Sequence, residues 1–221
     1  MVHDMSVRSF DSWAESLCPA PRRRVQRLIV DLKLKTGLDV GCGAASPLTA
    51  LRKRGFHSTG LDISSASIQA AKRLDLHDEY VEGDIRDCEL QEQYDVITCC
   101  HVIEHLPREE GKVLLSRLEK MARHLVYIET PNGFREQVSV ELPQRHLSGW
   151  FSHDFIARGY TVFGSGIKGI RGSYGVTRVL SEPLTRTVER ATQWLVFRNP
   201  AVAGTIGAVR FRDEHGNFRN V

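Results

Sequence analysis

Long apolar stretches are missing from this sequence. No run approaches the roughly 20 apolar residues that a membrane-spanning helix needs, and the first residues, MVHDMSVRSFDSW, lack the hydrophobic core of a signal peptide. We therefore expect a cytoplasmic protein that is neither secreted nor inserted into a membrane.

An excess of one charge is also missing. The 30 Lys and Arg residues nearly balance the 27 Asp and Glu residues, which leaves a formal net charge of +3. Residues of the two signs are interspersed along the chain, so no large basic field is available to hold a polyanion, and nucleic acid is not an expected partner. The densest basic run, residues 22–24, precedes apolar residues at helical spacing. This pattern predicts the solvated face of an amphipathic helix; a phosphate-binding patch is the alternative.

The five cysteines form no CxxC pair and show no spacing typical of a zinc site or a disulfide framework. They are Cys18, Cys42, Cys88, Cys99 and Cys100. This usage fits a reducing compartment such as the cytoplasm.

The 221 residues, 41% of them hydrophobic, suit one globular core. We expect a single domain over residues 1–221 that begins with helices within residues 9–34. Short apolar segments and helical segments then alternate. Strands are predicted at 37–41, 57–63, 79–82, 94–100 and 125–129, with helices at 48–54, 65–74 and 109–121 between them. A later helix at 150–158, strands at 160–167 and 207–211, and a helix at 188–197 complete the pattern. It predicts an α/β fold: a doubly wound, mostly parallel, seven-stranded sheet with helices on both faces and a late antiparallel strand pair.

Glycines and an acid follow the first two predicted strands. Gly41 and Gly43 stand where the first strand ends and the backbone has to turn close to a ligand. Asp62 ends the next strand, where a carboxylate accepts hydrogen bonds from ribose hydroxyls. A dinucleotide fingerprint would need glycine or alanine at Ser46, so the spacing favours S-adenosylmethionine (SAM) over NAD.

The segments LDVGCG, GLDIS, EGDI, YDVITCCHVIEHLP and YIETPNG occur in an order that resembles the class I SAM-dependent methyltransferase family, with its Rossmann-like fold. The resemblance extends from Gly37 to about Tyr160. Ala45 stands where the family usually has a third glycine, and we expect it to narrow the turn without blocking it.

The resemblance implies SAM as cofactor and a role for each matching position. Gly41, Cys42 and Gly43 would pass under the methionine part of SAM, and Asp39 would anchor this turn. The further contacts implied are Asp62 with the ribose, Ile63 and the Ile85 amide with the adenine ring, Asp84 with the adenine amino group, and His101 with the sulfonium side of the pocket. For any one Asp alone, a turn or helix cap is the competing interpretation.

Two histidines are candidate catalytic residues, His105 and His146. Methyl transfer to a hydroxyl needs a group that accepts the proton, and histidine does so near neutral pH. A hydrogen-bonded structural histidine is the alternative for each.

A second, narrower resemblance concerns the small-RNA 2′-O-methyltransferases related to Hen1. Those enzymes hold a divalent ion with two glutamates and two histidines. Glu104, His105 and His146 match three of these positions, but His101 replaces the first glutamate. This set would suit a transition metal better than magnesium.

The main hypothesis is methyl transfer from SAM to an oxygen or nitrogen of a small metabolite, sugar or lipid-linked acceptor. Metal-assisted methylation of an RNA ribose is one alternative, and a non-catalytic SAM-fold binding protein is another. The acceptor would be bound by the N-terminal helices and by segments near 134–150 and 168–185, which contain no motif that identifies it. Nothing in the sequence indicates the oligomeric state.

Overall fold

The structure is a computed structural model, and it describes residues 20–88, 90, 93–136, 145–168, 182–212 and 218–219. The helix predicted at 9–17, Cys18, and parts of both predicted acceptor segments lie outside these residues.

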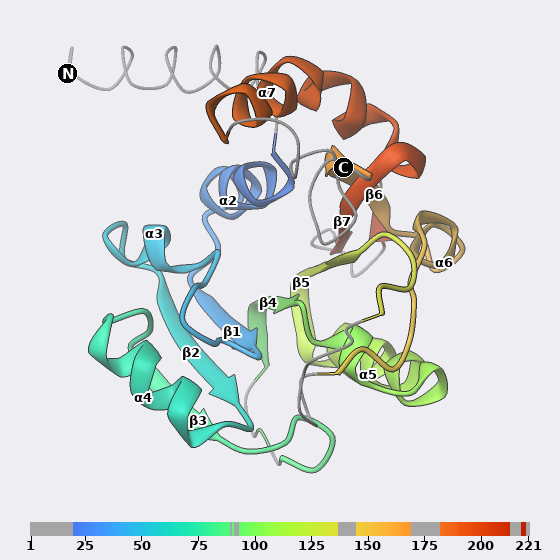
Figure 1. The fold of residues 1–221 in the computed structure, drawn as a ribbon. Helices are drawn as coiled ribbons and strands as arrows, with labels where there is room; N and C mark the ends of the chain where they lie inside the picture. Colours follow the sequence, from blue (N-terminus) through green and yellow to red (C-terminus); the bar gives the residue numbers. More distant parts are fainter. Residues whose placement is uncertain are drawn as a thin grey trace, which may run out of the picture.

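The sheet has the order β3-β2-β1-β4-β5-β7-β6 (Figure 1). Its strands are β1 (Thr36–Val40), β2 (His57–Asp62), β3 (Glu79–Glu82), β4 (Tyr94–Cys100), β5 (Ala122–Pro131), β6 (Thr161–Ile167) and β7 (Ala203–Arg212). The first five strands are parallel, and β7 runs antiparallel to both of its neighbours. A two-residue strand, β8 (Phe218–Arg219), pairs with β7. The predicted seven-stranded, mostly parallel sheet with a late antiparallel pair is therefore confirmed.

Helices connect the strands as expected, although several differ in length from the prediction. They are α2 (Pro21–Asp31), α3 (Thr49–Arg52), α4 (Ser65–Arg73), α5 (Arg108–Met121), α6 (Ser152–Ile156) and α7 (Glu182–Arg198), with short 3₁₀ turns η1 (Ile103–His105) and η3 (Pro200–Val202). Helices α3 and α6 are shorter than predicted, whereas α7 begins six residues earlier than the predicted start at residue 188. No helix among the described residues is long and apolar enough to cross a membrane.

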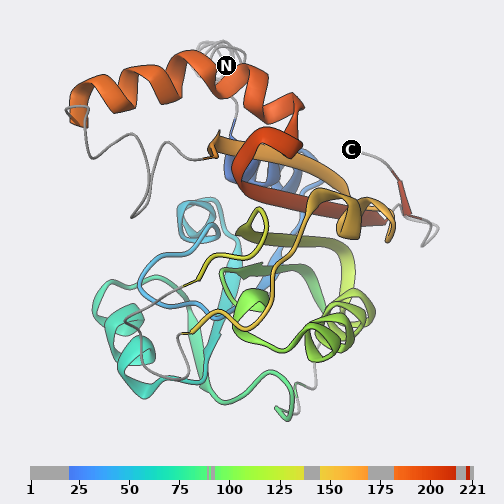
Figure 2. The same ribbon diagram turned by 45° about the vertical axis from the view of Figure 1, so that its right-hand side comes forward.

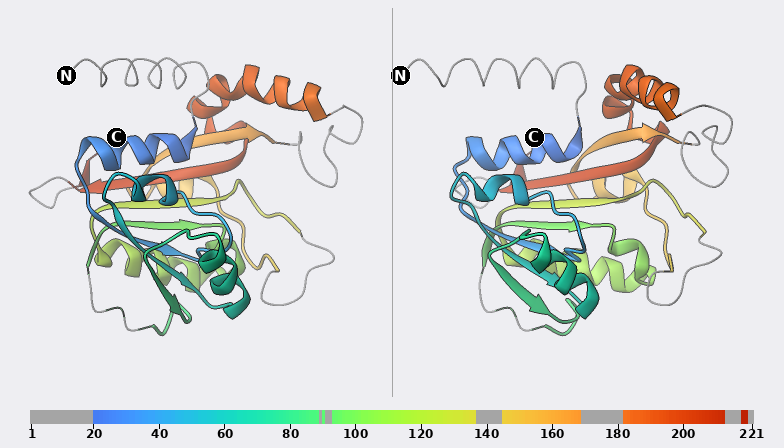
Figure 3. Two further views of the ribbon diagram at one scale, coloured as in Figure 1. Left: turned by 90° about the vertical axis from the view of Figure 1, so that its left-hand side faces the viewer. Right: turned by 60° about the vertical axis from the view of Figure 1, so that its left-hand side comes forward.

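Strand β5 shows why helices cover both faces of the sheet. Successive side chains of a strand point to opposite faces. Val126 and Ile128 pack in the same cluster as Leu115 of α5, whereas Leu125 and Tyr127 pack with residues of α2. Figures 2 and 3 show α2 and α5 on opposite sides of the sheet. This places the N-terminal helix over one face of the central strands.

The basic run at the start of α2 corrects part of the sequence interpretation. Arg23 is exposed, as predicted. Arg22 instead turns inward and binds Glu129 of β5 with two hydrogen bonds, of 2.8 and 2.9 Å. The prediction of a fully solvated face was wrong at Arg22 because hydrophobic periodicity does not detect a buried partner carboxylate.

Candidate active site

The turn after β1 depends on two glycines. Gly41 has a φ of +68° and Gly43 a φ of +47°, in the left-handed region that favours glycine. A Cβ on Gly41 would also lie 2.2 Å from Cγ2 of Val102. The Gly41 and Cys42 amides both donate to the Leu61 carbonyl, at 2.7 and 3.0 Å. The turn is therefore fixed against the end of β2.

Asp62 lies against this turn. One of its carboxylate oxygens accepts a hydrogen bond from the Gly43 amide at 3.0 Å, and the other accepts one from the Ser64 amide at 2.9 Å. The two groups that the sequence predicted to converge are thus in direct contact. A carboxylate has about four lone-pair sites, so two remain for a ligand's hydroxyl groups.

Asp39 is buried beside the turn. Its carboxylate accepts a hydrogen bond of 2.6 Å from the Thr98 hydroxyl. Its second oxygen lies 3.5 Å from Nε2 of the buried His77. This second Asp39 oxygen and Nε2 of His77 have no hydrogen-bond partner among the described residues. Asp39 therefore braces β1 against β4, and its predicted role in holding the glycine turn stays a prediction. No sequence motif indicated His77.

The residues predicted to contact adenine follow β2 and β3. The side chain of Ile63 is exposed, as a surface for a flat ring would be. Ile85 is buried in the core. Asp84 is held by Arg86, which donates to both of its carboxylate oxygens. These hydrogen bonds hold the pKa of Asp84 below its usual range, so its oxygens stay ionised acceptors.

Cys42 and Ala45 also belong to the turn after β1. Burial raises the pKa of the Cys42 thiol to about 12, so the thiol is not a nucleophile at neutral pH. Ala45 is absent from the residues with positive φ, so this position does not require glycine. The missing third glycine therefore imposes no backbone strain on the turn.

His101 directly follows β4 and adopts a φ of +57°, which is uncommon for a residue other than glycine. Its Nδ1 lies 3.1 Å from Glu104 and its Nε2 lies 3.3 Å from Glu129. Hydrogen bonds to Glu104 and then Glu129 raise the pKa of His101 to about 9, against the opposing effect of burial. His101 is thus a cation near neutral pH and a poor proton acceptor.

Glu129 is a residue that the sequence analysis missed. Besides Arg22, it accepts a 2.5 Å hydrogen bond from the Tyr127 hydroxyl. Burial opposes ionisation, but hydrogen bonds from His101 and Arg22 outweigh it and lower the pKa of Glu129 to about 2. Its position at the end of a parallel strand, like that of Asp62, was the available signal.

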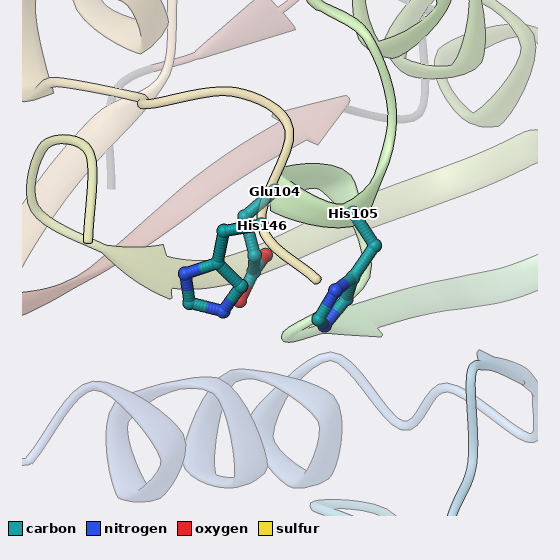
Figure 4. A group of neighbouring side chains, drawn as sticks. All are labelled: Glu104, His105 and His146. Atoms are coloured by element: carbon teal, nitrogen blue, oxygen red, sulfur yellow. The ribbon is translucent and has the colours of Figure 1, made fainter. Parts of the chain in front are cut away.

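Glu104, His105 and His146 form a cluster beside these charges (Figure 4). Glu104 and His105 come from η1, and His146 comes from the segment before α6. One possible ligand atom from each residue lies within 4.8 Å of the others. Glu104 is buried and accepts a hydrogen bond of 3.1 Å from the Thr130 hydroxyl. The structure therefore brings together both predicted catalytic histidines and all three candidate metal ligands.

The two histidines of the cluster are oriented by backbone carbonyls. Nδ1 of His105 lies 3.2 Å from the Arg145 carbonyl, and Nδ1 of His146 lies 2.9 Å from the Arg135 carbonyl. Each Nδ1 therefore carries a proton, and in the neutral ring each Nε2 has a free lone pair. Burial lowers the pKa of His146, with His105 adding to this effect and Glu104 opposing it. Such a lone pair either accepts a proton or binds a metal ion.

Residues 38–133 match a family model described as a methyltransferase domain. The strand order seen here is also that of a Rossmann-like methyltransferase sheet. Over residues 38–133 the chain is a methyltransferase domain, of the class I SAM-dependent type. SAM is the methyl donor of this family, as the sequence resemblance implied.

Curated relatives match the chain over part of its length. A ubiquinone biosynthesis O-methyltransferase of Marinobacter nauticus is 37% identical over 86 residues, covering 35% of this chain and 36% of the relative. A protein of the same name from Alkalilimnicola ehrlichii is 29% identical over 147 residues, covering 57% and 59%. The chain thus spans between about a third and three fifths of the length of these two relatives.

Solved structures share the fold at low sequence identity. The SAM-bound magnesium protoporphyrin IX methyltransferase of Synechocystis has a TM-score of 0.51 at 17% identity, covering 96% of this chain and 80% of that one. The methyltransferase domain of bacterial CtHen1 has a TM-score of 0.52 at 21% identity, covering 86% and 96%.

Proposed function

We propose that this protein, acting as one domain, transfers the methyl group of SAM to an oxygen of a small-molecule acceptor. The hydrogen bond between the Gly43 amide and Asp62 carries the cofactor part of this proposal, because it joins the glycine turn to the acid that would bind the ribose. Oxygen is favoured over nitrogen because the matched relatives are named O-methyltransferases and because a neutral histidine is present to accept a hydroxyl proton.

The residues of the chain fit SAM. Gly41 and Gly43 have no side chains that would hinder the approach of a ligand to the turn, and Asp62 keeps lone pairs for the ribose hydroxyls. Exposed Ile63 offers an apolar surface for adenine, beside which Asp84 would accept from the amino group. When bound, SAM supplies a methyl group already activated on a sulfonium.

The residues that bind the acceptor then have to orient its hydroxyl and remove the proton. Nε2 of His146 would accept this proton as the oxygen takes the methyl group, and the donor leaves as neutral S-adenosylhomocysteine (SAH). His105 would take the same role if the acceptor lies on its side of the cluster. Alignment of two reactants contributes roughly 7–11 kcal/mol, and a general base adds about 10²–10⁴-fold.

Calorimetry with SAM and SAH tests the cofactor site. Removing a charged hydrogen-bonding group costs about 1.5–3 kcal/mol, so Asp62→Ala should weaken SAH binding roughly 10–150-fold. Asp31→Ala, at an exposed residue at the end of α2, is the control and should bind as the parent does. Unchanged affinity in a folded Asp62→Ala protein would show that the ribose lies elsewhere.

Turnover on a panel of phenols, catechols, sugars and amines tests the acceptor part. His146→Gln should lower the rate by about 10²–10⁴-fold, while His153→Gln, whose side chain is 77% exposed, should not. Transfer to amines alone would contradict the proposal of an oxygen acceptor. Intact SAH binding without turnover on any of these acceptors would favour a non-catalytic binding protein.

A metal-assisted RNA ribose 2′-O-methyltransferase is the second candidate. The observation in its favour is the cluster of Glu104, His105 and His146, whose one carboxylate and two imidazoles suit a first-row transition metal. The histidines' Nδ1 atoms are already engaged, which leaves each Nε2 for the ion. These residues would hold a divalent ion that binds the ribose hydroxyls.

Metal analysis decides between the two candidates. Manganese or cobalt should raise the melting temperature of the parent protein and not that of His146→Gln if the cluster binds metal. Methylation of an RNA ribose 2′-hydroxyl that is abolished by a chelator would support the RNA candidate. Activity on a small hydroxyl acceptor that survives chelation would eliminate it.

A further inference from the structure

An ion pair joins helix α2 to the end of a central strand. Arg22 of α2 and Glu129 of β5 are 107 residues apart, and two nitrogens of the guanidinium donate to the two carboxylate oxygens. The Glu129 side chain is only 12% exposed. This pair is therefore a specific contact with a fork geometry that lysine does not reproduce.

Glu129 also contacts His101. The two residues are linked twice, because the His101 amide donates to the Glu129 carbonyl at 2.8 Å and Nε2 of the ring lies 3.3 Å from the carboxylate. His101 needs such support, since its left-handed backbone costs about 1–2 kcal/mol. Glu104 holds Nδ1 of the ring and Glu129 holds Nε2, so both carboxylates together orient a side chain that is 45% exposed.

Stability alone does not account for this arrangement. The Arg22 side chain is 39% exposed, so the pair is partly buried. Taking the Glu129 carboxylate out of water costs desolvation energy that the attraction often only balances, and apolar side chains of similar size would also attach α2 to the sheet. The pair also stands at the carboxyl end of β4 and β5, the edge at which the glycine turn and Asp62 form the cofactor site.

We propose that Arg22 and Glu129 are positioning residues that fix the His101 ring where the acceptor meets the methyl donor. Helix α2 is then part of the acceptor site, and the exposed edge of His101 contacts the acceptor. This inference rests on the proposed methyl transfer.

The first test compares Arg22→Met with Arg23→Met, its exposed neighbour on the same helix. Arg22→Met should lower kcat roughly 10–100-fold, because small misplacements of reacting groups have effects of this size. The affinity for SAH should stay within about threefold of the parent, since Arg22 and Glu129 do not touch the cofactor turn. Arg22→Lys should recover part of the loss, and Arg23→Met should behave as the parent.

The double variant Arg22→Met/Glu129→Gln separates positioning from stability. Arg22→Met leaves the largely buried Glu129 carboxylate without one of its two cationic partners, so the melting temperature should fall. Removing that charge in the double variant should restore the melting temperature but not kcat. Recovery of kcat together with the melting temperature would overturn the proposal, as would an Arg22→Met rate equal to that of Arg23→Met.

A readout without turnover keeps this test separate from the proposed function. In the SAH-bound protein, the ring signals of His101 in ¹H–¹⁵N spectra should shift in Arg22→Met and stay in place in Arg23→Met. Unmoved signals in Arg22→Met would refute the positioning role. Shifted signals in a protein that methylates no acceptor would leave the positioning intact and refute the methyl transfer.

Discussion

At the scale of single residues, Gly41 and Gly55 have similar backbones and different surroundings. Their φ values are +68° and +74°. A Cβ on Gly41 would meet Val102 at 2.2 Å, whereas a Cβ on Gly55 would meet nothing within 4 Å. The two positions therefore separate the cost of the left-handed backbone from the cost of a steric clash.

Gly55→Ala should lower the free energy of unfolding by about 1–2 kcal/mol, the cost of a left-handed residue with a Cβ. Gly41→Ala should cost about 1–3 kcal/mol more, because the new methyl group displaces Val102. Urea denaturation measures both. SAH affinity should fall only in Gly41→Ala, and equal effects of the two substitutions on affinity would show that the turn does not contact the cofactor.

The charge of His101 should make the free energy of unfolding depend on pH. Its pKa in the folded protein is about 9, above the usual 6.5, so the folded state binds its proton more tightly than the unfolded state. The resulting stabilisation is fully present below pH 6.5 and is lost as the pH rises through 9. Urea denaturation between pH 6 and 10 should show this loss in the parent protein and a smaller loss in His101→Gln. Parallel profiles for the two proteins would contradict the assigned charge.

At the scale of elements, the packing of α2 against the sheet depends on a glycine in β7. A Cβ on Gly207 would lie 2.5 Å from Cβ of Pro21 and 2.9 Å from the Tyr127 hydroxyl. Gly207→Ala should therefore push α2 off the sheet and cost about 1–3 kcal/mol. Gly204→Ala is the matched control in the same strand, because its nearest contact is the movable end of Arg135 at 3.1 Å. A smaller effect of Gly207→Ala than of Gly204→Ala would mean that α2 does not depend on this contact.

The elements that follow local rules were predictable from the sequence. Strands β1 and β4 are short apolar segments, and α4 and α5 carry apolar residues at helical spacing. The carboxyl ends of parallel strands meet at one edge, so Asp62 and the glycine turn could be placed together before any coordinates. The length of α3 was overestimated, because only four of the seven residues predicted to be helical form the helix.

The contacts between distant segments were not predictable in this way. The apolar spacing of α2 assigns Arg22 to the outer face, and only its partner on β5 shows why it turns inward. The His77–Asp39 contact likewise joins the loop before β3 to β1. Periodicity reports which face of an element is buried, but it does not report which charge lies opposite.

At the scale of the whole molecule, one edge of the sheet collects every group assigned to the chemistry. The proposed cofactor residues lie in or directly after β1, β2 and β3, apart from His101, which follows β4. Glu129 lies near the end of β5, and the Glu104–His105–His146 cluster comes from segments after β4 and β5. The proposed roles therefore put the methyl donor beside β1, β2 and β3 and the acceptor towards α2 and β5. A ligand bound there contacts segments from across the chain, so its binding is coupled to global folding.

Addition of SAH should therefore raise the melting temperature. A ligand present at 100 times its Kd stabilises the folded state by about 2.7 kcal/mol, which for a chain of this size corresponds to a shift of roughly 5–11 °C. The same SAH concentration should shift Asp62→Ala far less, because its Kd is raised, while Asp31→Ala should match the parent. NAD should give no shift, since the glycine turn lacks the spacing for a dinucleotide. A larger shift with NAD than with SAH would refute the assignment of this edge to a methyl donor.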